Sequence, residues 1–233
     1  MRVFALAAYA VVCYGASILS LVVLYSWLGG FDLPPLRLRL DEGGDAVFAA
    51  ALAWNTLIMI GFALYHSVFA RSAIKARTRR LVGQNLERAT YNLLSAILAI
   101  LLCVAWRPIP LSLWELSAPA AVLTMQVTYA LLWVVHMTSI VFMDHNDFFG
   151  LRQIGLAMFG QEYTPLPPVP ESYYLWTRLT LVISLGLIPW ASPIMTLGRL
   201  QLCLFMTAYV VLGAWLSNRD RGDLSTVPAA AVS

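Results

Sequence analysis

The chain of 233 residues is 60% hydrophobic and only 12% charged, with a mean hydropathy of +0.75. Ordinary soluble domains carry about a quarter charged residues, so this composition excludes a soluble globular domain and indicates an integral membrane protein. The formal net charge of +3 is small and scattered along the chain, so we expect the lipid bilayer as a partner and no nucleic acid.

Apolar segments of roughly 20 residues can cross a hydrocarbon core about 30 Å thick, and the chain contains about six of them. The predicted spans are Val3–Leu28, Ala46–Ala70, Ala89–Trp106, Pro119–Met143, Leu175–Trp190 and Thr196–Leu216. Pro189 and Pro193 join the last two, which predicts a tight hairpin. The sequence therefore predicts an all-α polytopic membrane helix bundle in a single domain, 1–224, with a disordered tail at 225–233.

The first apolar segment is too long for the core of a signal peptide and lacks a convincing cleavage site, so we predict a retained span. Orientation follows from the basic residues between the second and third spans, which no acidic cluster compensates: Arg71, Lys75, Arg77, Arg79, Arg80 and Arg88. Loops rich in Lys and Arg stay in the cytoplasm. We therefore expect both termini, and the loop at 144–174, to face the cytoplasm.

Three cysteines, Cys13, Cys103 and Cys203, lie within predicted spans and at no metal-ligand spacing. We interpret them as core residues, without a disulfide. His136 lies inside the fourth predicted span. A histidine within a helix bundle is usually satisfied by a neighbouring hydroxyl or carbonyl group, which is the preferred interpretation here.

The only long polar segment, Asp144–Tyr174, follows the fourth predicted span. It opens with "DHNDFFGLRQ" at 144–153, where ionisable side chains interrupt the apolar run. Leu151–Phe159 has the pattern of a short interfacial helix, and the prolines within "YTPLPPVPESYY" at 163–174 predict an extended segment. A structured loop of this length usually covers a functional site, so we expect any chemistry to lie here.

Two interpretations of the opening motif remain open. Asp144 or Asp147 pairs with Arg152 in a helix-end ion pair that needs no ligand, with Gln153 in solvent. Alternatively, the motif forms a polar pocket for a charged ligand. Gly150 would then allow a close backbone approach, Arg152 would bind a carboxylate, and Asp147 would hold ribose hydroxyls or a cation.

Two further histidines lie close to the same end of the predicted bundle. His66 is near the end of the second span and His145 opens the polar motif. Ionisable groups at membrane depth tend to mark functional sites. A metal-binding or haem-binding role for His66 and His145, with Asp147 as a third ligand, is an alternative, but no fixed spacing supports it and we predict no metal.

Five ordered blocks carry a family resemblance: "YHSVFAR" at Tyr65–Arg71, "LERATY" at Leu86–Tyr91, "WRPIP" at Trp106–Pro110, "HNDFFGLRQ" at His145–Gln153 and "YTPLP" at Tyr163–Pro167. Their order and spacing resemble a bacterial membrane family, the methanethiol S-methyltransferases. That family is similar to the isoprenylcysteine carboxyl methyltransferases and to nurim. The likeness covers roughly Ala51 to Asp220.

The resemblance implies an enzyme of the bacterial inner membrane that binds S-adenosylmethionine in a cytoplasm-facing pocket and methylates a small thiol. Together with the chemistry of the polar motif, it implies these cofactor-binding residues: His145, Asp147, Arg152, Gln153, Tyr163 and Arg178. A sulfonium methyl donor is already activated, so the protein must mainly align a thiolate and exclude water. Arg152 or Arg178 would lower the pKa of the thiol, and no catalytic residue is assigned.

The chain departs from the resemblance at one cofactor block. Related enzymes carry Arg-His-Pro-x-Tyr-x-Gly at the start of the penultimate span, and here that block falls on Arg178–Ser184, where only Arg178 matches. An acidic pair expected after the last span falls near Ser217 and Asn218. These losses keep a second hypothesis open, a catalytically inactive, nurim-like protein with a structural or partner-binding role.

Overall fold

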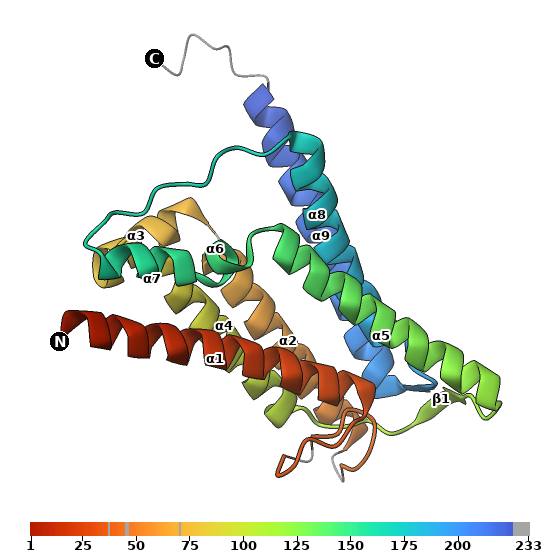
Figure 1. Cartoon of the computed structure of the whole chain (residues 1–233). Coiled ribbons are helices and arrows are strands. Elements are labelled where there is room, and N and C mark those ends of the chain that lie inside the picture. The colour runs from red at the N-terminus through yellow and green to blue at the C-terminus, as the bar shows by residue number, and fades with distance from the viewer. Residues whose placement is uncertain (37, 45–46, 70, 226–233) are drawn as a thin grey trace.

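A computed structural model of the chain describes residues 1–36, 38–44, 47–69 and 71–225, and its secondary structure is mainly helical (Figure 1). The long helices are α1 (Arg2–Gly29), α2 (Phe48–Phe69), α4 (Glu87–Ala105), α5 (Pro119–Phe142), α8 (Glu171–Leu187) and α9 (Leu197–Ser225). The shorter elements are α3 (Ser72–Val82), α6 (His145–Phe149), α7 (Leu151–Met158), the 3-10 turn η1 (Ile188–Trp190), and the strands β1 (Ser112–Glu115) and β2 (Ile194–Thr196). The predicted all-α membrane bundle is confirmed.

Among the described residues, five helices are long and apolar enough to cross a membrane: α1, α2, α4, α5 and the Leu197–Trp215 part of α9. The bounds of the fifth predicted span, Leu175–Trp190, are corrected to Glu171–Leu187, the range of α8. This helix has 17 residues, because it starts after Pro170 and gives way to η1 at Ile188, next to Pro189, so it is shorter than the other long helices. Of the predicted disordered tail, 225–233, residues 226–233 lie outside the described residues, and the prediction is wrong for Ser225, which ends α9.

The prediction that the last two long helices form a hairpin agrees with the packing of α8 against α9, with η1 and β2 between them. The sequence did not predict the small sheet. Strand β1 pairs antiparallel with β2, with Ser112 opposite Thr196 and Glu115 opposite Ile194. All four residues of β1 are exposed, so no alternation of buried and exposed residues marks it.

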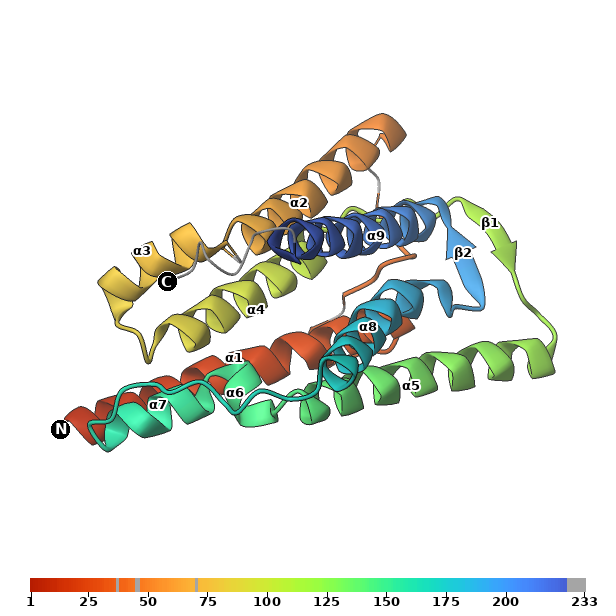
Figure 2. The ribbon, with the colours of Figure 1, turned by 90° about the horizontal axis from the view of Figure 1, so that it is seen from above.

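The two ends of the bundle differ in structure. Figure 2 shows α3, α6, α7 and the N-terminus at one end, with β1 and β2 at the other. Helix α1 packs along α4, and α5 packs along α8. The proline-rich segment at 161–170 forms neither helix nor strand, which is compatible with the extended conformation predicted from Tyr163 onward, and it runs from α7 to α8 (Figure 1). The prediction of an extended segment is wrong for Glu171–Tyr174, because these residues form the first turn of α8.

The three cysteines and His136 have the environments that the sequence analysis predicts. Cys13, Cys103 and Cys203 are buried and free. The Nδ1 atom of His136 lies 3.1 Å from the Ser184 hydroxyl and 3.2 Å from the Leu181 carbonyl, so a hydroxyl and a carbonyl satisfy this histidine. These contacts join α5 to α8 within the bundle.

A buried ion pair closes the strand end of the bundle. The guanidinium of Arg199, whose residue is 2% exposed, donates from Nε to both carboxylate oxygens of Asp41 at 3.2 and 3.0 Å. It also donates to the carbonyls of Leu28 and Pro189. The Thr196 hydroxyl donates to the same carboxylate at 2.7 Å. Arg199 therefore links the loop after α1 to the start of α9.

Candidate functional site

The polar motif folds into two short helices joined at Gly150. Asp144 has a positive φ of 64° and caps α6, where its Oδ1 accepts a hydrogen bond from the Asp147 amide at 2.9 Å. Gly150 has a φ of 84°, and a Cβ atom there would lie 2.7 Å from the backbone nitrogen of Ala89. The motif glycine thus permits a close backbone approach, and the approaching backbone belongs to α4.

The carboxylate of Asp147 is the centre of a cluster that we call the Asp147 cluster: Asp147, Arg152, Gln153 and Tyr163. Its Oδ1 accepts hydrogen bonds from Arg152 Nη1 at 3.2 Å and Gln153 Nε2 at 3.1 Å. Its Oδ2 accepts a long hydrogen bond from the Tyr163 hydroxyl at 3.4 Å. The guanidinium carbon of Arg152 lies 5.5 Å from the centre of the Tyr163 ring. Four of the six predicted site residues therefore meet, and Asp147 forms the predicted ion pair with Arg152.

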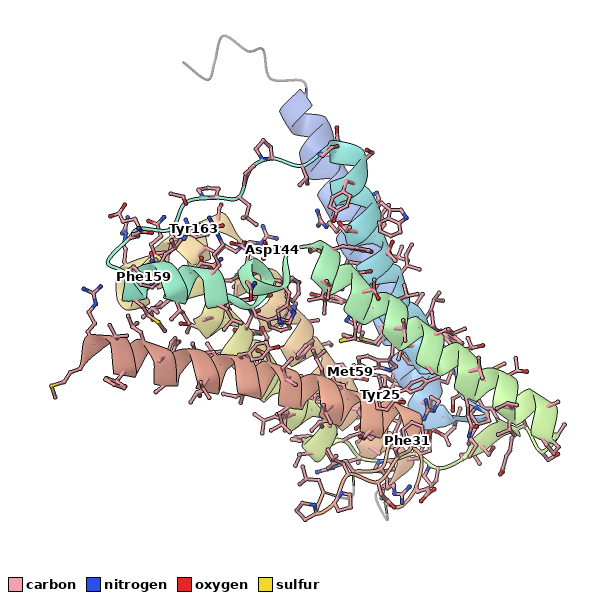
Figure 3. The ribbon with its side chains drawn as sticks, in the orientation of Figure 1. Tyr25, Phe31, Met59, Asp144, Phe159 and Tyr163 are labelled. Carbon is pink, nitrogen blue, oxygen red and sulfur yellow. The ribbon has the colours of Figure 1, made fainter. Side chains whose placement is uncertain are left out.

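The segment after α7 that carries Gln161, Tyr163 and Thr164 is held by side chains from two parts of the chain. Arg152 Nη1 donates to the Thr164 carbonyl at 2.7 Å. Asn85, in the turn between α3 and α4, donates to the carbonyls of Gln153 and Gln161 at 3.1 and 2.9 Å. Its Oδ1 accepts the amide of Tyr163 at 3.1 Å. In Figure 3, Asp144 lies at the junction of α5 and α6, and Tyr163 lies on the segment beside α7.

Helix α4 supports α6 through a single carbonyl. Arg88 Nε and Asn92 Nδ2 both donate to the Phe148 carbonyl, at 2.9 and 2.8 Å. The guanidinium of Arg88 also lies 5.3 Å from the centre of the Phe148 ring. The sequence reasoning did not place Asn85, Arg88 and Asn92 in the site. The available signal was "LERATY" at 86–91, which contains Arg88 and is flanked by both asparagines.

Two groups of the Asp147 cluster have unusual environments. Gln153 is 4% exposed, and its Oε1 is buried without a hydrogen-bond partner among the described residues. Buried acceptors are normally paired with a protein group, an ordered water or a ligand. Burial raises the pKa of the Tyr163 phenol, and the negative charge of Asp147 and their hydrogen bond raise it further, against opposing effects of Arg152 and Arg88. The phenol therefore stays a neutral donor at physiological pH.

Among the described residues, the other two predicted site residues form no hydrogen bond with the cluster. His145 is on α6, but its Nε2 lies 3.0 Å from the Tyr14 hydroxyl of α1, and its ring packs edge-on against Phe149. Arg178 is on α8, which packs against α5 and α9. Within the part of the chain that the structure describes, no hydrogen bond or ion pair joins Arg178 to the Asp147 cluster.

The alternative metal trio is not assembled. His66 lies among aromatic rings, stacked on Phe62 and 5.5 Å from the centre of the Tyr91 ring. Its Nδ1 has no hydrogen-bond partner in the described chain, whereas His145 contacts α1. Over 1–36, 38–44, 47–69 and 71–225, no group of three His, Cys, Asp or Glu side chains is placed to hold a metal.

A cavity of about 340 Å³ adjoins the segment fixed by Asn85. Its walls come from the start of α1, the turn at 82–86 and the end of α7 with 160–162. Asn85 and Gln161 line it, and both are hydrogen-bonded to the segment that carries Tyr163. Pockets for small ligands usually measure about 300–1,000 Å³, so this cavity has the size of a ligand site.

The helical spans, together with a polar cluster built at one end of the bundle, define a multi-span integral membrane protein with a candidate site in its long loop. The chain is 34% identical over 212 residues to Methanethiol S-methyltransferase 2 of Bradyrhizobium diazoefficiens, covering 91% of this chain and 80% of that protein. It is 32% identical over 215 residues to Methanethiol S-methyltransferase of Mycobacterium tuberculosis, covering 91% and 88%. The chain belongs to the methanethiol S-methyltransferase family.

A second group of relatives carries another name. The chain is 28% identical over 214 residues to the Nurim homolog of Drosophila melanogaster, covering 88% of this chain and 80% of that protein. No family model matches the chain. No solved structure matches it either. The predicted resemblance to methanethiol S-methyltransferases and nurim is therefore confirmed by whole-chain similarity.

Proposed function

We propose that this protein binds S-adenosylmethionine at the Asp147 cluster and transfers its methyl group to methanethiol or another small or lipophilic thiol. The observation that carries the proposal is the similarity over 91% of the chain to proteins named Methanethiol S-methyltransferase. The polar cluster at 147–163 supports it, because it gathers the group types that a cofactor with a carboxylate, hydroxyls and an adenine would need.

The residues of the cluster fit the cofactor by chemistry. The guanidinium of Arg152 would bind the carboxylate, and the carboxylate of Asp147 would accept hydrogen bonds from ribose hydroxyls. The unpartnered Oε1 of Gln153 would accept one further N–H or O–H group. The cavity of about 340 Å³ is lined by Gln161 and Glu162, which immediately precede Tyr163, and not by the four cluster residues themselves. These side chains bind one another in the structure, so cofactor binding would exchange some of these hydrogen bonds.

The protein's own contribution to the chemistry is modest. When bound, S-adenosylmethionine would supply an activated methyl group: a thiolate sulfur would bond to the methyl carbon as the bond from that carbon to the sulfonium breaks, and S-adenosylhomocysteine would leave as a neutral thioether. The chain must then keep the thiol ionised and exclude water. A guanidinium close to the thiol lowers its pKa, and the candidates are Arg152 in the cluster and Arg178 on α8. A contribution from Arg178 would require the ligand to reach from the cluster to α8.

We infer that the end of the bundle carrying α3, α6 and α7 faces the cytoplasm of a bacterial inner membrane, with both termini on that side. The basic residues of α3 support this orientation, because loops rich in Lys and Arg are retained inside. The test is reporter fusion at the two termini and in the loop that contains β1. Reporter activity that places β1 in the cytoplasm would contradict the orientation.

Equilibrium binding of radiolabelled S-adenosylmethionine to the purified protein tests the cofactor proposal. Saturable binding that weakens at least about tenfold in Arg152→Ala is expected, since a charge-assisted pair to a carboxylate contributes about 1.5–3 kcal/mol. Arg80→Ala, which removes an exposed cation of α3, is the matched control and should bind like the parent. Absence of binding by a folded, monodisperse sample would contradict the proposal.

A nurim-like, non-enzymatic role is the second candidate. It is favoured by the 28% identity to the Nurim homolog of Drosophila melanogaster and by the segment Arg178–Ser184, where only Arg178 matches the cofactor block of related enzymes. This candidate expects no binding of S-adenosylmethionine by the folded protein. It also expects Arg152→Ala to alter stability alone, because the Asp147–Arg152 pair would then serve only to fix the loop.

A further inference from the structure

Helix α3 has an unusual position for a short connecting helix. It links α2 to α4, which are both candidate membrane spans, and packs against each of them. Figures 1 and 2 place it at the same end of the bundle as α6 and α7. None of its residues is buried. Because two spans reach the bilayer surface where α3 begins and ends, α3 lies at the level of the lipid headgroups.

The charge of this segment is strongly one-sided. Its basic residues are Arg71, Lys75, Arg77, Arg79 and Arg80. No acidic residue occurs between Arg71 and Leu86. Arg79 pairs with Glu87 at 3.2 Å, and the other four form no ion pair with any side chain that the structure describes. Arg71, just before α3, and Lys75, Arg77 and Arg80 within it therefore have no counter-ion among the described side chains.

The same helix also presents an apolar stripe that basic side chains border. Ile74 and Leu81 are seven residues apart and share one face. Arg77, four residues before Leu81, borders this face on one side, and Lys75 borders it on the other. Leu81 is 80% exposed. A leucine this exposed beside unpaired cations matches the pattern of helices that lie in a membrane interface, with apolar groups toward the acyl chains and basic groups among the headgroups.

We propose that α3 is a binding surface for anionic phospholipid headgroups, with Lys75, Arg77 and Arg80 contacting the phosphates and Leu81 entering the acyl boundary. Charge complementarity identifies the occupant, because the four unpaired cations match the negative charge of anionic lipids in the same plane. The proposal is independent of methyl transfer, since Lys75, Arg77, Arg80 and Leu81 lie outside the Asp147 cluster.

The test measures which lipids the full-length protein retains. Detergent-purified protein is equilibrated with equal amounts of phosphatidylcholine and phosphatidylglycerol, and the bound lipids are quantified by mass spectrometry. The parent should retain phosphatidylglycerol with a preference of roughly threefold or more, which high salt reduces. The variant Lys75→Gln/Arg77→Gln/Arg80→Gln should lose this preference. Arg79 is left intact because it binds Glu87.

A charge-conserving variant is the matched control. Lys75→Arg/Arg77→Lys/Arg80→Lys changes the same three positions and should keep the preference. Arg107→Gln removes an exposed cation outside α3, from the segment between α4 and β1, and should also keep it. An unchanged preference in the folded glutamine variant, or equal loss in the charge-conserving variant, would overturn the proposal. Binding of S-adenosylmethionine is measured in a separate experiment, so the lipid-binding proposal and the cofactor proposal can each be refuted without the other.

Discussion

Gly150 and Ala89 bring the backbones of two segments into direct contact beneath the candidate site. A Cβ atom at Gly150 would lie 2.7 Å from the backbone nitrogen of Ala89 and 3.0 Å from its Cα. Ala89 also belongs to a small buried cluster with Cys13 and Ile154, which joins α1, α4 and α7. The position of the Asp147 cluster relative to the membrane spans therefore depends on a glycine at this junction.

Gly150→Ala should destabilise the protein by about 1–3 kcal/mol, because the new methyl group meets backbone atoms and the φ of 84° disfavours any side chain. Gly155→Ala is the matched control in α7, where an added Cβ would meet nothing within 4 Å. It should be neutral or stabilising by up to about 1 kcal/mol. Thermal unfolding in detergent measures both, and equal midpoints for the two variants would refute the role of the contact.

Loss of Arg199 should destabilise the strand end of the bundle. Arg199→Met leaves the carboxylate of Asp41 without its cation, and breaking a buried pair in this way costs about 3–5 kcal/mol. Arg39→Gln removes an ion pair with Asp32 in the same loop, where both side chains are partly exposed, so its cost should be about 0–1 kcal/mol. Chemical denaturation measures the free energy of unfolding of each variant. A cost for Arg199→Met no greater than that for Arg39→Gln would show that the buried pair contributes little.

The Tyr163 phenol should ionise above the usual tyrosine pKa of about 10. Because folding raises this pKa, the associated stability is complete below the unfolded value and is lost as the pH rises through the folded one. Ultraviolet titration of the parent minus that of Tyr163→Phe isolates this phenol. Asp147→Asn should lower the pKa, since it removes the negative charge beside the phenol. An unshifted midpoint in Asp147→Asn would mean that the two groups do not interact.

Asn85→Ala should release the segment that covers the cluster. The substitution removes three hydrogen bonds, to the carbonyls of Gln153 and Gln161 and from the amide of Tyr163. At about 1 kcal/mol for each, the loss is about 3 kcal/mol, enough to open the segment locally. Limited proteolysis should then cut within 159–170 more quickly than in the parent. Gln84→Ala, at the exposed neighbouring position, should leave the cleavage rate unchanged. Equal rates in both variants would rule out this restraint.

The parts of the fold that sequence reasoning predicted depend on strong local signals. Apolar runs gave five spans close to their observed bounds, and the burial of the cysteines followed from their place in those runs. The partner of His136 was predicted only by type, and Ser184 supplies the hydroxyl. One missed feature is long-range, because β1 pairs with a strand about eighty positions further on. The other is local: α8 ends at Leu187, beside Pro189, a boundary that the apolar run through Trp190 concealed.

The candidate site was predictable to the extent that it is contiguous. Asp147, Arg152 and Gln153 lie within one motif, so their meeting follows from two short helices and a turn. Asn85 and Arg88 come from a different segment, and their contacts with 148–163 depend on how α4 packs against α6 and α7. Arg178 was assigned through the family resemblance, which carries a residue type and a position but no direction for the side chain.

The most direct test of the central claim is methyl transfer by the purified protein in lipid nanodiscs. Methanethiol and S-adenosylmethionine carrying a deuterated methyl group are supplied, and labelled dimethyl sulfide is measured by gas chromatography with mass spectrometry. The proposed function predicts labelled product that requires the protein and falls at least about tenfold in Asp147→Asn, which loses the charge-assisted hydrogen bonds that the carboxylate would accept from the ribose hydroxyls. A folded, monodisperse protein that forms no labelled product with methanethiol or with larger lipophilic thiols would contradict it.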